Sequence, residues 1–140
     1  MVYLDTSVLG ALFFREPGAQ QIAERLARVR RPLRVSAWTV TEMASLAVIK
    51  QRTGAIDDAG RRAALAAFGQ FTRDSLQLSE VEPADFAAAA ALLEPVDLGL
   101  RAGDALHLAV ARRVGADLAT LDKRQAGAAR HHRIGLFALG

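Results

Sequence analysis

Short apolar runs that stop at an acidic residue strongly limit the folds that are open to this chain. Val2-Tyr3-Leu4 is followed by Asp5, and the run 118–121 is followed by Asp122. Apolar runs of this length, without polar alternation, are typical of strands buried on both faces of a sheet. Longer segments with helical spacing separate the runs. The chain is therefore predicted to form a parallel sheet with helices on both of its faces.

Further elements extend this pattern along the whole chain. Strands are expected at 34–36 and 76–78, with a last one at 134–138, and a helix is expected over 102–114 before Gly115. No internal repeat and no Ser/Gly/Pro-rich linker interrupts the 140 residues. The predicted fold class is α/β, a three-layer α/β/α arrangement around a central parallel sheet of four to five strands. Residues 1–140 are predicted to form a single domain.

Composition excludes several classes of function. The chain has no cysteine, so a disulfide framework, a thiolate zinc site and a cysteine nucleophile are all ruled out. No apolar run approaches the roughly 20 residues of a membrane span, and the first residues lack the basic region of a signal peptide. We therefore expect a cytoplasmic protein without a membrane partner. Its 18 basic and 15 acidic residues give a net charge of +3, which is weak support for an anionic partner.

Four acidic residues are candidates for a common site. Asp5 and Asp122 follow two of the predicted strands, and the carboxyl ends of parallel strands are where ligands collect. Glu42 falls early in the helix after the second strand. Asp104 falls in the first turn of the helix that leads to the fourth strand. If these strands belong to one sheet, all four carboxylates lie near the same edge.

Each acid also has a purely structural explanation. Asp5 and Asp122 can cap the helices that follow them, and Asp104 suits the positive end of a helix dipole. The segment from Thr39 to Glu42 matches a capping box, with Thr39 as the cap. Capping is the better explanation for any one of these acids alone. When all four acids lie at one edge of the sheet, coincidence is a weaker explanation than a common site.

A divalent cation would resolve the repulsion in such a cluster. Several adjacent carboxylates cannot all remain ionised without a counter-charge, and oxygen ligands suit Mg²⁺ or Mn²⁺. The hydroxyls of Thr6, Ser7 and Thr120 stand beside the acids in the sequence and could hold a water on the metal. Their ordinary role, at the start of a helix, explains them equally well.

At this point the motifs resemble the PIN domain, and in particular VapC-type toxins of bacterial toxin–antitoxin pairs. Four segments carry the resemblance, in order and across nearly the whole chain: 4–7, 36–42, 100–109 (Leu-Arg-Ala-Gly-Asp-Ala-Leu-His-Leu-Ala) and 118–122. The resemblance implies a single ribonuclease domain whose acids Asp5, Glu42, Asp104 and Asp122 bind Mg²⁺ or Mn²⁺. Ser7 and Thr120 match family positions with a supporting hydroxyl. The resemblance further implies an RNA substrate, a cognate VapB-like antitoxin and a homodimer.

The sequence gives weaker indications of function at several other residues. His107 shares a helix face with Asp104, but an oxygen-only site requires no histidine. Arg101 precedes Asp104 and could overhang the site, whereas the remaining basic residues are explained at least as well by solvated faces. Phe13 and Phe14 could line a groove for a partner helix, although ordinary core packing is favoured from the sequence alone.

The sequence thus predicts a metal-dependent endoribonuclease that acts as a toxin. Two alternatives remain open. One is a non-catalytic module that binds RNA or a protein partner on the same fold. The other is phosphoryl transfer through an aspartyl nucleophile, which needs a second acid on the same loop as the acceptor. Position 7 is Ser7, which counts against the second alternative.

Overall fold

The computed structural model describes residues 1–140 and is built on a four-stranded parallel sheet. Its strands are β1 (Val2–Leu4), β2 (Leu33–Ser36), β3 (Leu76–Ser79) and β4 (Asp117–Ala119), in the spatial order β3-β2-β1-β4. β1 pairs with β2 on one side and with β4 on the other. All three residues of β1 are buried, because the strand lies in the middle of the sheet with helices above and below it.

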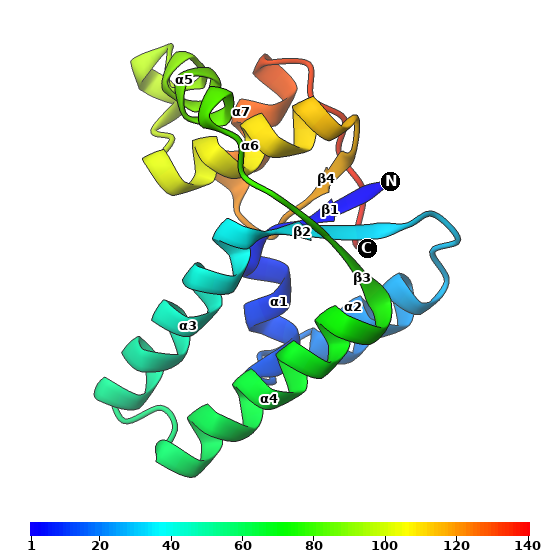
Figure 1. Ribbon diagram of the computed structural model, residues 1–140, viewed down its shortest axis with the longest axis vertical. Coiled ribbons are helices and arrows are strands. Elements are labelled where there is room, and N and C mark those ends of the chain that lie inside the picture. The colour runs from blue at the N-terminus through cyan, green and yellow to red at the C-terminus, as the bar shows by residue number, and fades with distance from the viewer.

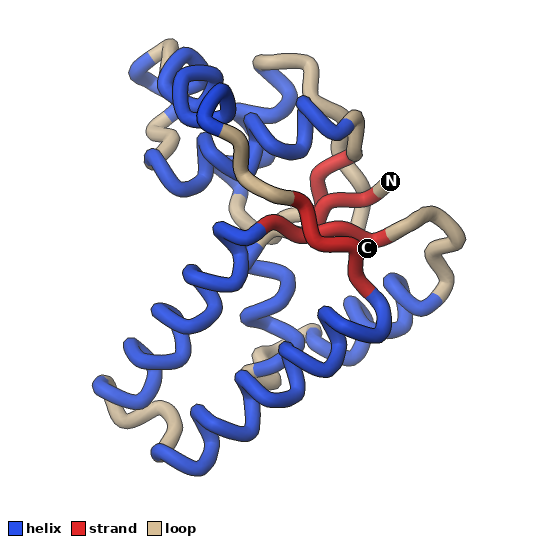
Figure 2. The backbone as a smooth tube through the Cα atoms, in the orientation of Figure 1, coloured by secondary structure: helices blue, strands red, loops and turns tan.

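Seven α-helices cover the sheet in two layers (Figure 1). Figure 2 shows the strands between a group formed by α1 to α4 and a group formed by α5 to α7, so the predicted three-layer α/β arrangement is confirmed. None of the helices is both long enough and apolar enough to cross a membrane. The helices are α1 (Thr6–Phe13), α2 (Ala19–Ala27), α3 (Ala37–Arg52), α4 (Asp58–Ser75), α5 (Pro83–Leu92), α6 (Ala102–Val114) and α7 (Lys123–His131), with a 3-10 turn, η1 (Val96–Leu98), between α5 and α6.

The alternation of side chains along β1 divides the interior into two cores. Tyr3 belongs to a buried cluster with residues of α5, α6 and α7. Val2 and Leu4 belong to a second cluster, formed mainly with α1 to α4. Successive side chains of a strand point to opposite faces of the sheet, so one three-residue strand contributes to both cores.

Two predicted strand assignments differ from the structure. The predicted last strand at 134–138 forms only one isolated parallel bridge, between Leu118 and Leu136. Its neighbour β4 is short, which leaves little edge for a fifth strand to pair with. β4 ends at Ala119 and not at Leu121, because the Asp122 side chain accepts hydrogen bonds from backbone N–H groups at the start of α7 and the chain has already left the sheet.

The start of α3 also corrects the sequence interpretation. The cap of this helix is Ser36, and Thr39 occupies the third helical position, where its hydroxyl oxygen accepts a hydrogen bond from the Ser36 backbone N–H at 3.2 Å. The predicted capping box from Thr39 to Glu42 is therefore wrong. The reason is that the chain turns into the helix directly at the end of β2, which places Glu42 beyond the first turn.

A buried ion pair fastens α5 to α6. The side chain of Asp85 is only 2% exposed and accepts hydrogen bonds from Arg113 Nε at 2.8 Å and Nη2 at 2.9 Å. It also accepts one from the Glu82 backbone N–H at 2.8 Å. Burial acts to raise the pKa of Asp85, but these hydrogen bonds and the charge of Arg113 outweigh it and hold the pKa below its usual value.

We predict that Arg113→Ala lowers the free energy of unfolding by about 3 kcal/mol at pH 7, because it leaves the Asp85 carboxylate buried without its partner. Urea denaturation measures the change. Arg112→Ala is the matched control, since Arg112 is exposed and forms no ion pair, and it should change stability by less than about 0.5 kcal/mol.

The same pair predicts a pH dependence. A carboxyl whose pKa is lowered by folding contributes stability above its unfolded pKa and loses that contribution as the pH falls. The difference in the free energy of unfolding between the wild type and Arg113→Ala should therefore become smaller below about pH 4. A difference that stays constant down to acid pH would contradict this role of Asp85.

Candidate active site

The carboxyl ends of β1 and β4 bring Asp5 and Asp122 to one edge of the sheet. The two strands pair in parallel, with Leu4 opposite Ala119, so the residues that follow them leave the sheet on the same side. Asp5 caps α1 by accepting a hydrogen bond from Ser7 N–H at 3.0 Å. Asp122 caps α7 in the same way, through Arg124 N–H at 2.8 Å and Gln125 N–H at 3.0 Å. Both acids are therefore caps and also neighbours at one edge.

The Asp5 carboxylate is buried and held from several directions. Besides Ser7 N–H, its Oδ2 lies 3.2 Å from the Thr120 hydroxyl, and its Oδ1 accepts a hydrogen bond from Gln125 Nε2 at 3.2 Å. The Ser7 and Thr120 hydroxyl oxygens are 3.3 Å apart, which ties α1 to the segment after β4. A carboxylate has about four lone-pair positions, so Asp5 retains room for a further partner.

Gln125 is a site residue that the sequence analysis missed. Its side chain is completely buried and its Oε1 lies 2.6 Å from the Thr120 hydroxyl. The signal in the sequence is weak. Gln125 shares a helix face with the buried Ala128 and Ala129, and a polar residue on such a face needs a buried partner. Nothing in the sequence identifies Asp5, 120 positions away, as that partner.

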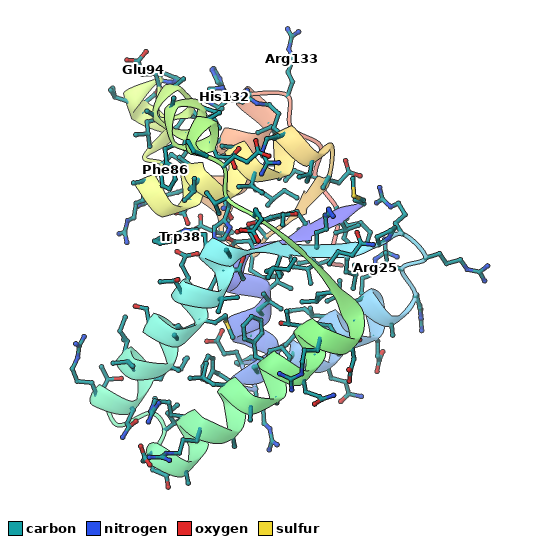
Figure 3. The ribbon with its side chains drawn as sticks, viewed as in Figure 1. Arg25, Trp38, Phe86, Glu94, His132 and Arg133 are labelled. Carbon is teal, nitrogen blue, oxygen red and sulfur yellow. The ribbon has the colours of Figure 1, made fainter.

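Glu42 reaches the cluster from α3. Its Oε1 accepts a hydrogen bond from the Thr6 hydroxyl at 2.7 Å and contacts Nε2 of His107. Gly103 permits this approach of α3 to α6, because a Cβ atom at position 103 would lie only 3.1 Å from Glu42 Oε2 and 3.3 Å from the Trp38 ring. Trp38 lies in the first turn of α3 (Figure 3), is partly buried and packs against the core.

His107 lies deeper in the cluster than the sequence analysis suggested. It is completely buried, with Nε2 3.6 Å from Asp5 Oδ1 and Nδ1 2.6 Å from the Tyr3 hydroxyl. Tyr3 in turn donates a hydrogen bond to Ser36 Oγ at 2.8 Å. Burial raises the pKa of Tyr3, so its hydroxyl stays neutral. A buried chain of hydrogen bonds therefore runs from β2 through Tyr3 and His107 to Glu42.

Asp104 and Asp122 line an open, polar cavity beside this network. The cavity has a volume of about 340 Å³, and its walls contain no hydrophobic residue. The pKa of Asp104 is raised to about 6. Partial burial is the largest cause, and the negative charges of Asp5, Asp122 and Glu42 add to it. The other three acids are thus close enough for their charges to disfavour the ionisation of Asp104.

These features fit a hard divalent cation, although the side chains do not form a ready-made cluster of three or more metal ligands. Every carboxylate in the group offers oxygen donors, and burial together with the negative charges of its neighbours raises the pKa of Asp104. Asp5, Glu42, Asp104 and Asp122 are the residues that could hold the ion. Asp117 cannot take part, because it lies at the opposite end of β4 and pairs with Arg31 at 2.7 Å.

Comparison with known proteins agrees with this geometry. The chain matches the sequence profile of the PIN domain over residues 2–131. A search of curated protein sequences found no significant match. Among solved structures, VapC20 of Mycobacterium tuberculosis, described as a sarcin-ricin loop cleaving toxin, superposes with a TM-score of 0.73 at 20% identity, over 91% of this chain and 95% of the other.

Two further structures cover nearly the full length. FitAcB from Neisseria gonorrhoeae has a TM-score of 0.69 at 17% identity, and VapBC-1 from nontypeable Haemophilus influenzae has 0.69 at 16%, each over 99% of this chain and 98% of the other. At these identities the likeness shows a shared fold. Together with the profile match across most of its length, it establishes that the chain belongs to the PIN-domain family.

Proposed function

We propose that this protein is a Mg²⁺- or Mn²⁺-dependent endoribonuclease and the toxin of a toxin–antitoxin pair. The observation that carries the proposal is the gathering of four carboxylates, from four separate segments, around the carboxyl ends of β1 and β4. Structural neighbours in the same family are toxins, and one of them is described as cleaving the sarcin-ricin loop. Nuclease activity is the function that best uses an acidic, oxygen-only site in this family.

In this proposal Asp5, Asp104 and Asp122 hold the cation, and Glu42 completes its ligand set or orients the water that attacks phosphorus. When bound, the cation neutralises the negative charge that develops on the phosphodiester. The Ser7 backbone N–H and the Thr120 hydroxyl keep Asp5 in place, and the Ser7 hydroxyl lies against that of Thr120. The Thr6 hydroxyl keeps Glu42 in place through its 2.7 Å hydrogen bond. Arg101, at the start of α6, adds positive charge at the mouth of the cavity.

His107 is a positioning residue in this scheme. It contacts Glu42 directly, and Tyr3 fixes the other side of its ring. Removal of a hydrogen-bonded partner behind a metal ligand typically changes metal affinity or activity by about 10- to 100-fold. The buried chain therefore restricts Glu42 to one orientation toward the cation.

An antitoxin is the proposed protein partner, because structural neighbours of this chain are toxin–antitoxin complexes. Two apolar hollows beside Phe13 are the surfaces that an apolar partner segment would fill. Phe13 contributes to both, and it packs on Phe68 and Phe71 with ring centroids 5.8 and 5.7 Å apart. A homodimer remains a prediction from the family resemblance, and a cytoplasmic location remains a prediction from the sequence composition.

The first test is Asp5→Asn, which removes one proposed ligand without changing the shape of the side chain. We expect RNA cleavage in the presence of Mn²⁺ to fall at least about a hundredfold, since a bound metal contributes several kcal/mol to transition-state stabilisation. Wild type and variant are expressed in cells, growth is followed, and cleaved RNAs are mapped by sequencing. Chelation with EDTA should abolish wild-type cleavage in vitro.

Asp117→Asn is the matched control, because Asp117 lies on β4 at the edge away from the cluster. It should cleave RNA as the wild type does, and circular dichroism should show that both variants are folded. Cleavage by Asp5→Asn at the wild-type rate would exclude the proposed mechanism. RNA binding without cleavage by the wild type would favour the alternative of a non-catalytic module.

The second test is Tyr3→Phe, which removes only the hydroxyl that fixes His107. We expect about tenfold weaker Mn²⁺ binding, measured by calorimetry, and a lower kcat for RNA cleavage with an unchanged KM. Ser79→Ala is the control, since it also removes a buried hydroxyl, but one that has no hydrogen-bond partner. Wild-type Mn²⁺ affinity and kcat in Tyr3→Phe would show that the hydrogen-bond chain does not position Glu42.

A further inference from the structure

Three basic side chains surround the polar cavity that contains Asp104 and Asp122. Arg101 is the cap of α6, and Lys123 and Arg124 are the first two residues of α7. All three are exposed, and together with Gly99 and the two acids they form the whole lining. The lining of the cavity therefore contains both acidic and basic side chains.

Ion pairing within the protein does not explain these three basic residues. None of these three residues has a carboxylate within 4.0 Å of its charged group, whereas Arg31, Arg61, Arg62, Arg113 and Lys50 all form ion pairs. Their positions in the helices are also unfavourable. A positive charge in the first turn of a helix is repelled by the helix dipole, which favours acidic residues there. Neither local helix stability nor neutralisation of the acids accounts for these three cations.

The Arg124 side chain lies beside the turn that follows η1. Gly99, which follows η1, has a φ angle of +63°, in the left-handed region that favours glycine. A Cβ atom at position 99 would lie 3.7 Å from Arg124 Cδ, so the arginine side chain runs along this turn. Arg124 therefore lies next to this turn, and its guanidinium forms no ion pair with the protein.

We propose that Arg101, Lys123 and Arg124 form a subsite that binds the phosphodiester backbone of the RNA strand next to the bond that is cleaved. This inference rests on the proposed nuclease function. Four carboxylates repel a polyanion, and one divalent cation cannot offset all of their charge. Cations on the flank of the site attract the strand, and guanidinium groups bind phosphate oxygens in pairs.

Other basic residues lie elsewhere and do not form such a subsite. Arg25 and Arg31 lie over the ring of Phe137, at 4.8 and 5.6 Å from its centroid, and Arg31 is also paired with Asp117. Figure 3 shows Arg25 at the opposite end of the strands from Trp38, which marks the carboxyl end of β2. The cations of the cavity therefore lie beside the acids, whereas Arg25 and Arg31 lie at the opposite end of the strands.

The experiment compares two triple variants with the same change of charge. Arg101→Ala/Lys123→Ala/Arg124→Ala removes the subsite, and Arg28→Ala/Arg30→Ala/Arg112→Ala removes three arginines that have no ion pair and lie outside the cavity. Both are made in full-length Asp5→Asn, so that RNA is not cleaved. Binding of a fluorescein-labelled single-stranded RNA is measured by anisotropy with Mg²⁺ over a series of KCl concentrations.

We expect the subsite variant to bind RNA at least about tenfold more weakly than Asp5→Asn alone. The slope of log K against log salt should fall by about 0.7 for each phosphate group that the variant no longer neutralises. The control should keep most of the affinity and the slope. Equal decreases in affinity in the two variants would overturn the proposal, because RNA would then respond only to net charge. Unchanged binding by the subsite variant would overturn it as well.

Cleavage by the wild type is measured separately, which distinguishes failure of the subsite from failure of the nuclease assignment. If the wild type cleaves no RNA but the two triple variants still differ in RNA binding, the three cations are confirmed as an RNA-binding site and the proposed nuclease function is wrong. If the wild type cleaves RNA and the variants bind alike, only the subsite fails. The three single variants, each altering one exposed side chain, repeat the comparison if the triple variant does not fold.

Discussion

The parallel pairing of β1 with β4 is the contact around which the acidic site is assembled. It brings the two chain segments that follow these strands out of the same edge of the sheet, and each segment contains an aspartate that caps the next helix. The burial of Asp5 then requires donors. Ser7, Thr120 and Gln125 supply them, and in doing so they connect α1, the end of β4 and α7. Asp5 is therefore both a helix cap and the centre of a polar network.

Electrostatic strain is concentrated at this edge. The raised pKa of Asp104 shows that burial and neighbouring acids disfavour its charged form, and no basic side chain of the cavity pairs with it. A stable protein tolerates this arrangement because the sheet and the two helical layers hold the backbone in place around it. The proposed cation would relieve the repulsion among the acids, and the proposed RNA strand would supply partners for the free cations. Both proposals follow from charges that the protein alone leaves unbalanced.

The two faces of β1 have different consequences for function. Tyr3 points into the layer of α5 to α7, where its hydroxyl meets His107 and so reaches Glu42 across the sheet edge. Val2 and Leu4 point into the other layer, where α1, α2 and α4 leave apolar hollows around Phe13. Tyr3 and His107 of the proposed catalytic network therefore lie on one face of β1, and the proposed partner surface lies in the helical layer on the other face.

The amino-acid sequence was enough to predict the four strands of the sheet, the order of helices and strands, and the edge at which Asp5, Asp104 and Asp122 emerge, because these features depend on residues close together in the chain. The helix over 102–114 was predicted to the residue for the same reason. Tertiary packing alone determined that His107 and Gln125 join the acids and that the segment 134–138 pairs at one position. Each of these depends on which surfaces meet, and local periodicity carries no information about contacts between residues 65 or 120 positions apart.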